Sequence, residues 1–189
     1  MLQPHAASHA TAPRLSAVDL ACRRGNRLLF HALDFELHAE QIVWVRGQNG
    51  RGKTSLLRLA AGLSTPERGK ILFDGRLVFI AHANALKEDL SASEALAFLL
   101  RIQGRACDAP TVHGALARMG LASRRDAMVR SLSQGQRRRV ALARLAVENE
   151  PSLWLLDEPF DALDADGVAC LNQLLLEHAR RGGSVLLAS

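Results

Sequence analysis

The residues of this chain best placed to do chemistry form one short run, in which three glycines precede a lysine and a threonine. The run reads Gly47-Gln48-Asn49-Gly50-Arg51-Gly52-Lys53-Thr54-Ser55. It follows the apolar segment Gln41–Val45 and precedes the helix-like segment Leu56–Ala60. A glycine loop between a strand and a helix, with lysine and threonine at the helix start, is the pattern of a phosphate-binding P-loop.

Each residue type in this loop has a physical reason to be there. Gly47, Gly50 and Gly52 allow the backbone to curl until successive N–H groups point inward at phosphate oxygens. The N-terminus of the following helix adds partial positive charge behind them. Lys53 can then reach the β- and γ-phosphates, and the Thr54 hydroxyl can be a ligand of Mg²⁺. We therefore predict that ATP and Mg²⁺ bind at this run, although an ordinary glycine turn is the alternative.

A second candidate for chemistry is the acidic sequence Asp157-Glu158-Pro159, which follows the apolar run Leu153–Leu156. We expect this run to be a buried strand beside the P-loop strand, so that its carboxyl end lies near the phosphates. Asp157 is then predicted to pair with Thr54 across the metal ion. Glu158 is predicted to orient and deprotonate an attacking water. Without the P-loop, an acidic turn after a strand would be the better explanation.

The elements that must position these residues are strands and helices in a mixed order, which predicts an α/β fold. Leu15–Ala21 and Leu33–Leu37 enclose a turn signal and predict an antiparallel, half-exposed pair. The strand around Val43 is apolar on both faces, as expected of a central parallel strand. Further strands are predicted at 70–73, 77–80 and 184–188, and helices from about 134 to 147 and from 165 to 181.

Two stretches differ from the rest of the chain. From about residue 84 to residue 130, apolar residues recur three or four apart, which predicts an inserted helical subdomain. Ala95, Leu96, Leu99 and Leu100 form one apolar stripe there. Residues 1–13 show no periodicity and are expected to be a disordered tail. We therefore predict that residues 14–189 form a single nucleotide-binding domain.

Length and composition limit the classes of protein that fit. The 189 residues are 48% hydrophobic and 23% charged, which suits one α/β domain. The net charge of +5 comes from scattered arginines, and with no tyrosine to stack on bases we expect no nucleic-acid partner. Three isolated cysteines, no signal peptide and no apolar run of roughly 18 residues predict a location in the cytosol or on the cytosolic side of a membrane.

A third motif identifies a family. Leu132-Ser133-Gln134-Gly135-Gln136 lies between the P-loop and the acidic pair. With these neighbours it resembles the signature motif of ABC-type ATPases, and the resemblance covers nearly the whole chain from Leu15. It implies an α/β P-loop NTPase of ABC type, with a parallel core sheet, an N-terminal antiparallel β subdomain and the helical insertion. It also implies ATP hydrolysis.

The same resemblance implies a homodimer. The signature begins a helix, so Ser133 and the Gly135 amide, with Gln136, would form a second anion site. In the family, two protomers face head to tail, and each signature caps the γ-phosphate bound by its partner's P-loop. Asp164, in Ala162-Leu163-Asp164, is then expected in a D-loop that crosses the interface. The run Arg137–Arg139 is either a membrane or partner patch or a solvated helix face.

Three departures from the family pattern follow. Arg24 stands where an adenine-stacking aromatic is common, and a guanidinium can also stack on a base. His82 is the polar residue nearest to the expected Q-loop glutamine, with a catalytic role or a structural one open. The chain ends at Ser189, one residue before the expected position of the switch histidine, so it looks truncated. We expect such a chain to bind ATP but to hydrolyse it roughly 10²–10³-fold more slowly.

The segment Phe79–Leu96 and the sequence Asp157–Asp164 resemble the haem-exporter ATPases of bacterial cytochrome c maturation. This implies integral-membrane transporter subunits as partners and a peripheral position on the cytoplasmic face of the inner membrane. Haem would be contacted only indirectly, since the chain has no CxxCH and its seven histidines lack ligand spacing. The alternatives are an ATPase subunit for another substrate, a soluble ABC ATPase, or a fragment without turnover.

Overall fold

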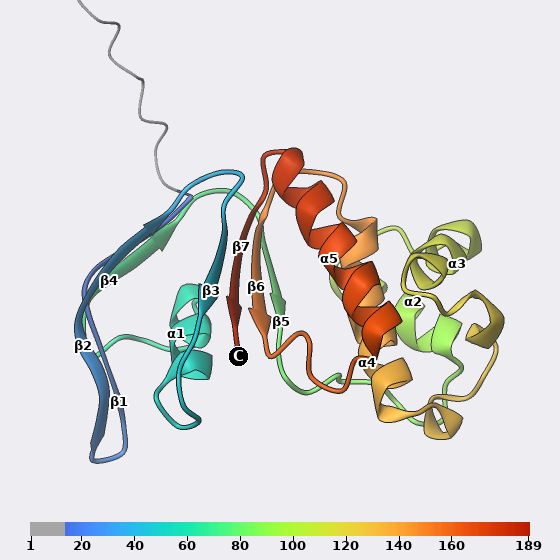
Figure 1. Cartoon of the computed structure of the whole chain (residues 1–189), viewed down its shortest axis with the longest axis horizontal. Helices are drawn as coiled ribbons and strands as arrows, with labels where there is room; N and C mark the ends of the chain where they lie inside the picture. The colour runs from blue at the N-terminus through green and yellow to red at the C-terminus, as the bar shows by residue number, and fades with distance from the viewer. Residues whose placement is uncertain (1–13) are drawn as a thin grey trace, which may run out of the picture.

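The computed structural model describes residues 14–189, and the tail predicted at residues 1–13 lies outside the described residues. The strands of this part form two sheets, seen side by side in Figure 1. One is antiparallel with the order β2-β1-β4, and the other is parallel with the order β3-β7-β6-β5. The antiparallel strands are β1 (Leu15–Arg24), β2 (Arg27–Leu37) and β4 (Arg68–Phe73). The parallel strands are β3 (Ile42–Val45), β5 (Leu77–Ile80), β6 (Leu153–Asp157) and β7 (Ser184–Ala188).

The β1–β2 hairpin confirms the predicted antiparallel pair and extends it. Gly25 has a positive φ of 57° at the turn, a conformation that glycine adopts without strain. Along β2, Leu33, Phe35 and Leu37 pack against the core clusters, whereas Asp34 and Glu36 between them are exposed. Because of this alternation, one face of the antiparallel sheet is exposed to solvent and the other is covered by the core.

Helix α1 (Lys53–Ala60) fills the space between the two sheets, as Figure 1 shows. Leu57 packs into a buried cluster with Leu155 and Leu186 of the parallel sheet. On another face of the helix, Leu56 and Leu59 pack against the antiparallel sheet in a second cluster. The helix is therefore held on both sides, and its N-terminus, where Lys53 and Thr54 lie, is fixed relative to β6 and β7.

The other face of the parallel sheet is covered by helices. Figure 1 shows α5 (Ala165–Arg180) along this face, with α4 (Gln134–Ala143), α2 (Ala92–Ile102) and α3 (Ala109–Arg118) beyond it. Trp154 and Leu187 of the sheet join one large buried cluster with residues of these helices. The predicted apolar stripe of α2 lies in the protein interior, with Leu96 and Leu100 fully buried. Within residues 14–189 no helix is long and apolar enough to cross a bilayer.

Three predictions about these elements are wrong. The strand around Val43 is not central: β3 is at the edge of the parallel sheet, and its Ile42, Val43 and Trp44 are 37–43% exposed. The strand that ends in Asp157 does not adjoin the P-loop strand, because β7 lies between β3 and β6. The helix predicted through residue 147 ends at Ala143, and its last turn is a 3₁₀ segment.

A buried histidine ties α5 to the parallel sheet. The ring of His178 stacks on Trp154 with centroids 3.7 Å apart, and neither residue is accessible to solvent. Its Nε2 lies 2.8 Å from the Ser152 carbonyl, which can only accept, so Nε2 carries the proton. Burial, with the positive charges of Arg181 and Arg14, lowers the pKa of His178 to about 4.

We predict that this histidine makes folding sensitive to pH. The unfolded chain takes up the proton near pH 6.5, whereas the folded chain takes it up only near pH 4. The stability that the neutral ring contributes is therefore complete above pH 6.5 and is lost as the pH falls toward 4, by roughly 3 kcal/mol in all. Urea unfolding from pH 7 to pH 4 should show a shallower decline for His178→Gln than for wild type. The control is His31→Gln, at an exposed site on β2, which should decline like wild type.

Candidate functional site

The P-loop wraps around the first turn of α1. Gly52 is the N-cap residue, with a φ of 96°, and Gly50 has a φ of 78°. A Cβ on Gly52 would lie 3.1 Å from side-chain atoms of Leu29 and Phe30, so space as well as φ favours glycine there. Gly47 differs from the prediction, because its φ is not in the left-handed region and its Cβ position is open. Its contribution is instead its carbonyl oxygen.

Lys53 is held by the loop that it follows. Its Nζ donates to the Gly47 carbonyl at 2.6 Å and to Asn49 Oδ1 at 3.4 Å, and the residue is only 9% exposed. Both acceptors are neutral, so the nearly buried ammonium has no counter-charge among these hydrogen bonds. Such a group gains strongly from an anionic ligand, because hydrogen bonds between charged partners are about twice as strong as neutral ones.

Thr54 and Asp157 lie together although β3, which precedes the P-loop, is not a neighbour of β6. The Thr54 hydroxyl donates to Asp157 Oδ1 at 3.1 Å, and Asp157 is 2% exposed. A hydroxyl beside a carboxylate is a donor set that suits Mg²⁺, which accepts one or two protein oxygens and completes its shell with water and phosphate. Residues 14–189 contain no group of three or more His, Cys, Asp or Glu that could hold a metal ion.

Glu158 follows Asp157 in a strained backbone conformation, with a φ of 47° that is uncommon outside glycine. Its N–H donates to the Ala188 carbonyl at 2.8 Å, which anchors it to the end of β7. Its Oε2 lies 3.7 Å from Nδ1 of His82. The two side chains therefore form an ion pair whenever His82 is protonated.

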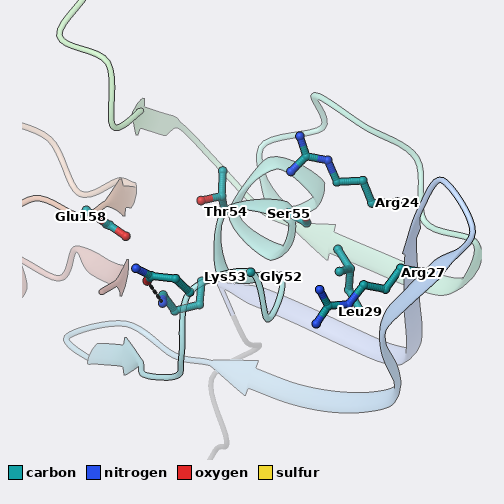
Figure 2. Close-up of a pocket in the computed structure, with 10 residues that line it drawn as sticks. Arg24, Arg27, Leu29, Gly52, Lys53, Thr54, Ser55 and Glu158 are labelled. Atoms are coloured by element: carbon teal, nitrogen blue, oxygen red, sulfur yellow. Dashed lines mark hydrogen bonds between the residues drawn. The ribbon is translucent and has the colours of Figure 1, made fainter.

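Lys53, Thr54 and Glu158 border one cavity of about 310 Å³, shown in Figure 2. Glu158 lies on one side of it, and Arg24 and Arg27 lie on the opposite side, on the β1–β2 hairpin. The predicted nucleotide residue Arg24 is thus placed at the cavity. Arg27 and Leu29 also line it and were not predicted. The sequence contained a signal for Arg27, because a tight turn at Gly25 makes Arg27 the strand partner of Arg24.

The signature residues border a second cavity of about 340 Å³, with Asp164 and without any P-loop residue. Ser133 is the N-cap of α4: its hydroxyl accepts from the Gln136 N–H at 3.2 Å, and Gln136 Oε1 accepts from the Ser133 N–H at 3.0 Å. Asp164 is the N-cap of α5 and also contacts Arg139. Within a single chain, Ser133 and Gln136 therefore cap α4, and Asp164 caps α5.

Two of the three arginines that follow the signature, Arg138 and Arg139, are buried, whereas Arg137 is partly exposed. Arg138 is 3% exposed and Arg139 is 9% exposed, so both the membrane patch and the solvated face are excluded for them. Burial lowers the pKa of Arg138, while the carboxylates of Asp161, Asp157 and Glu158 act in the opposite direction. A run of three arginines suggests a solvent-exposed helix face, but from Arg138 onward the residues of α4 are buried.

Comparison with known proteins agrees with this geometry. The family model described as ABC transporter matches residues 30–161. A cytochrome c biogenesis ATP-binding export protein CcmA of Vibrio cholerae is 43% identical, over 93% of this chain and 90% of its own length. The CcmA of Xanthomonas axonopodis pv. citri is 44% identical, over 96% of this chain and 88% of its own length.

A solved structure supports the fold. A putative ABC transporter ATP-binding protein from Pyrococcus furiosus superimposes with a TM-score of 0.81 at 23% identity, over 93% of this chain and 90% of that one. At that identity the likeness concerns the architecture alone. The motifs, the family model and the nearly full-length relatives together settle the family. The chain belongs to the ABC transporter family of ATP-binding subunits, among the cytochrome c biogenesis ATP-binding export proteins.

Proposed function

We propose that this chain is the ATP-hydrolysing subunit of a bacterial exporter that serves cytochrome c biogenesis. One observation carries the catalytic part of the proposal. Lys53 and Thr54 at the start of α1 meet Asp157 and Glu158 at the end of β6, with Thr54 Oγ1 and Asp157 Oδ1 3.1 Å apart. A phosphate site, a metal-ligating pair and a general base thus meet within one catalytic centre.

The proposal that this site binds a nucleotide rests on the neutral groups that Lys53 now bonds to. In this structure its ammonium bonds to the Gly47 carbonyl and Asn49. With ATP bound, the β- and γ-phosphate oxygens replace these weaker acceptors, while loop amides hold the remaining phosphate oxygens. Thr54 and Asp157 would hold Mg²⁺, which neutralises charge on the phosphates. Arg24 and Arg27 lie at the far side of the cavity and are proposed to contact the base or ribose.

Hydrolysis is assigned to Glu158. Its carboxylate orients a water in line with the γ-phosphorus and takes a proton as the water oxygen attacks. The bond between the γ-phosphorus and the β–γ bridging oxygen breaks, which leaves ADP and phosphate. His82, 3.7 Å from the carboxylate, limits the directions in which Glu158 can turn.

A second protomer completes the site in this proposal. The signature cavity and the P-loop cavity share no lining residue, so one chain cannot apply both to the same nucleotide. A head-to-tail dimer places Ser133, Gly135 and Gln136 of each protomer on the γ-phosphate held by the other. The N-terminus of α4 then contributes its partial positive charge, and Asp164 lies at the interface.

The remaining parts of the proposal rest on the relatives, which are named as cytochrome c biogenesis export proteins. We assign integral-membrane transporter subunits as partners and a peripheral position on the cytoplasmic face of the inner membrane. The ATPase cycle would drive release of a haem-loaded chaperone on the opposite side. This chain would meet haem only indirectly, through those subunits.

We predict that Lys53→Ala abolishes nucleotide binding, because the variant loses the buried ammonium that faces the phosphates. For wild type, ATP·Mg²⁺ at a hundredfold excess over Kd should stabilise the fold by about 2.7 kcal/mol. Thermal unfolding with and without ATP should show this gain for wild type and for Lys70→Ala, an exposed lysine on β4. An undiminished gain in Lys53→Ala would refute the assignment.

We predict that Glu158→Gln keeps ATP binding but loses hydrolysis, because an amide can hold the water but cannot take its proton. The expected loss in kcat is roughly 10²–10⁴-fold. Size-exclusion chromatography with ATP should then show a trapped dimer that wild type does not accumulate. The matched control, Glu150→Gln, changes an exposed carboxylate outside the cavity and should turn over normally. Normal turnover in Glu158→Gln would contradict its role as the base.

A further inference from the structure

One buried guanidinium joins the signature helix to both catalytic segments. Arg138 of α4 donates through Nη1 to the carbonyls of Ala81 at 3.0 Å and His82 at 3.1 Å, and to Asn84 Oδ1 at 3.1 Å. Through Nη2 it donates to the carbonyls of Asp157 at 2.8 Å and Glu158 at 2.9 Å. One planar group therefore holds the backbone of both residues in the His82–Glu158 pair.

Burying the guanidinium of Arg138 costs free energy, which its hydrogen bonds must offset. Arg138 is 3% exposed, and burying a charge is unfavourable when carbonyl dipoles rather than a directly bonded carboxylate receive it. A guanidinium presents its donors in a rigid fork, so it fixes the spacing between the groups that it bonds. His82 Nδ1 lies 3.7 Å from Glu158 Oε2. The guanidinium of Arg138 bonds to the backbone carbonyls of both residues, and so fixes the separation of the two backbones from which these side chains extend.

The Glu158 backbone needs such support. A φ of 47° is an unfavourable conformation for a non-glycine residue and persists only where neighbours hold it. Its N–H is fixed by the Ala188 carbonyl, and its own carbonyl is fixed by Arg138. The conformation of the proposed base is thus set by one bond from β7 and one from α4.

The adjacent arginines make different contacts. Arg137 bonds to the carbonyls of Leu132 and Arg130 and to Glu88, all outside the segments that carry His82 and Glu158. Arg139 contacts Asp164. Among the hydrogen bonds of residues 14–189, Arg138 is the one of the three that reaches both catalytic segments.

We propose that Arg138 is a positioning residue that sets the geometry of Glu158 against His82 and passes the position of the signature helix to the catalytic carboxylate. This inference rests on the proposed function, because it takes Glu158 as the base. When α4 shifts relative to the parallel sheet, both carbonyl groups of the pair shift with the guanidinium. A displacement of about 1 Å at a reacting group can cost about a hundredfold in rate.

The test compares Arg138→Lys and Arg138→Met with wild type in steady-state ATPase assays. A lysine keeps the charge but cannot bridge both segments, and methionine keeps only the stem. We expect kcat to fall roughly 10- to 100-fold in both variants, less in the lysine variant, while KM for ATP and ATP-dependent thermal stabilisation stay within about twofold. Unchanged kcat, or a loss confined to KM, would overturn the proposal.

A control separates positioning from general loss of stability. Arg105 forms a bidentate contact with Glu148, whose side chain is only 3% exposed, away from the nucleotide cavity. Arg105→Met should lower the unfolding temperature and leave the kcat of the folded fraction unchanged. If Arg138→Met loses kcat no more than Arg105→Met at equal loss of stability, Arg138 is structural only.

A double-mutant cycle completes the test. Single-turnover hydrolysis is measured for Glu158→Gln, Arg138→Met and both together. If Arg138 acts through Glu158, the double variant is as slow as Glu158→Gln alone. A further 10-fold or greater loss in the double variant shows that Arg138 acts elsewhere and overturns the proposal. Wild-type rates in Glu158→Gln would instead refute the proposed function, so the two failures are distinguishable.

Discussion

The site depends on the packing of one short helix between two sheets. Leu57 anchors α1 to the parallel sheet, and Leu56 and Leu59 anchor it to the antiparallel sheet. Removing such buried side chains typically costs several kcal/mol, so the helix has little freedom to shift. Since the P-loop is continuous with α1, its lysine and threonine inherit this fixed position. The carboxylates are held from the other side, by the parallel sheet and by Arg138 of α4.

The parallel sheet supplies that second position through its register. Asp157 on β6 stands opposite Ala188 on β7, and the N–H of the next residue, Glu158, bonds back to Ala188. Although β7 lies between β3 and β6, the P-loop residues and the carboxylates still lie close together. The helix start lies beside the carboxyl ends of the strands, and Thr54 reaches Asp157 across the intervening strand. Thr54 and Asp157 can therefore be in contact although β3 and β6 are not adjacent in the sheet.

Local sequence was enough to predict the elements and the main motifs. Glycine spacing, a lysine–threonine pair and an apolar strand before two carboxylates are properties of adjacent residues, and their chemistry constrains them strongly. The strand order was beyond such reasoning, because β3 is as apolar as a central strand and only tertiary packing places it at an edge. Arg138 was missed for a related reason: three successive arginines suggest an exposed helix face, and the burial of Arg138 depends on distant segments that meet around α4.

Gly135 illustrates how a motif residue can be constrained twice. A Cβ at this position would lie 2.5 Å from the backbone carbonyl oxygen of Ala162, in the loop that follows Glu158. That contact lies within one chain and needs neither ATP nor a partner. Any heavier residue at position 135 would therefore force apart two backbones of a single protomer. A sequence descended from this one that had lost all nucleotide binding would still be under steric pressure to keep a glycine there, so a surviving signature glycine is weak evidence of a working ATPase.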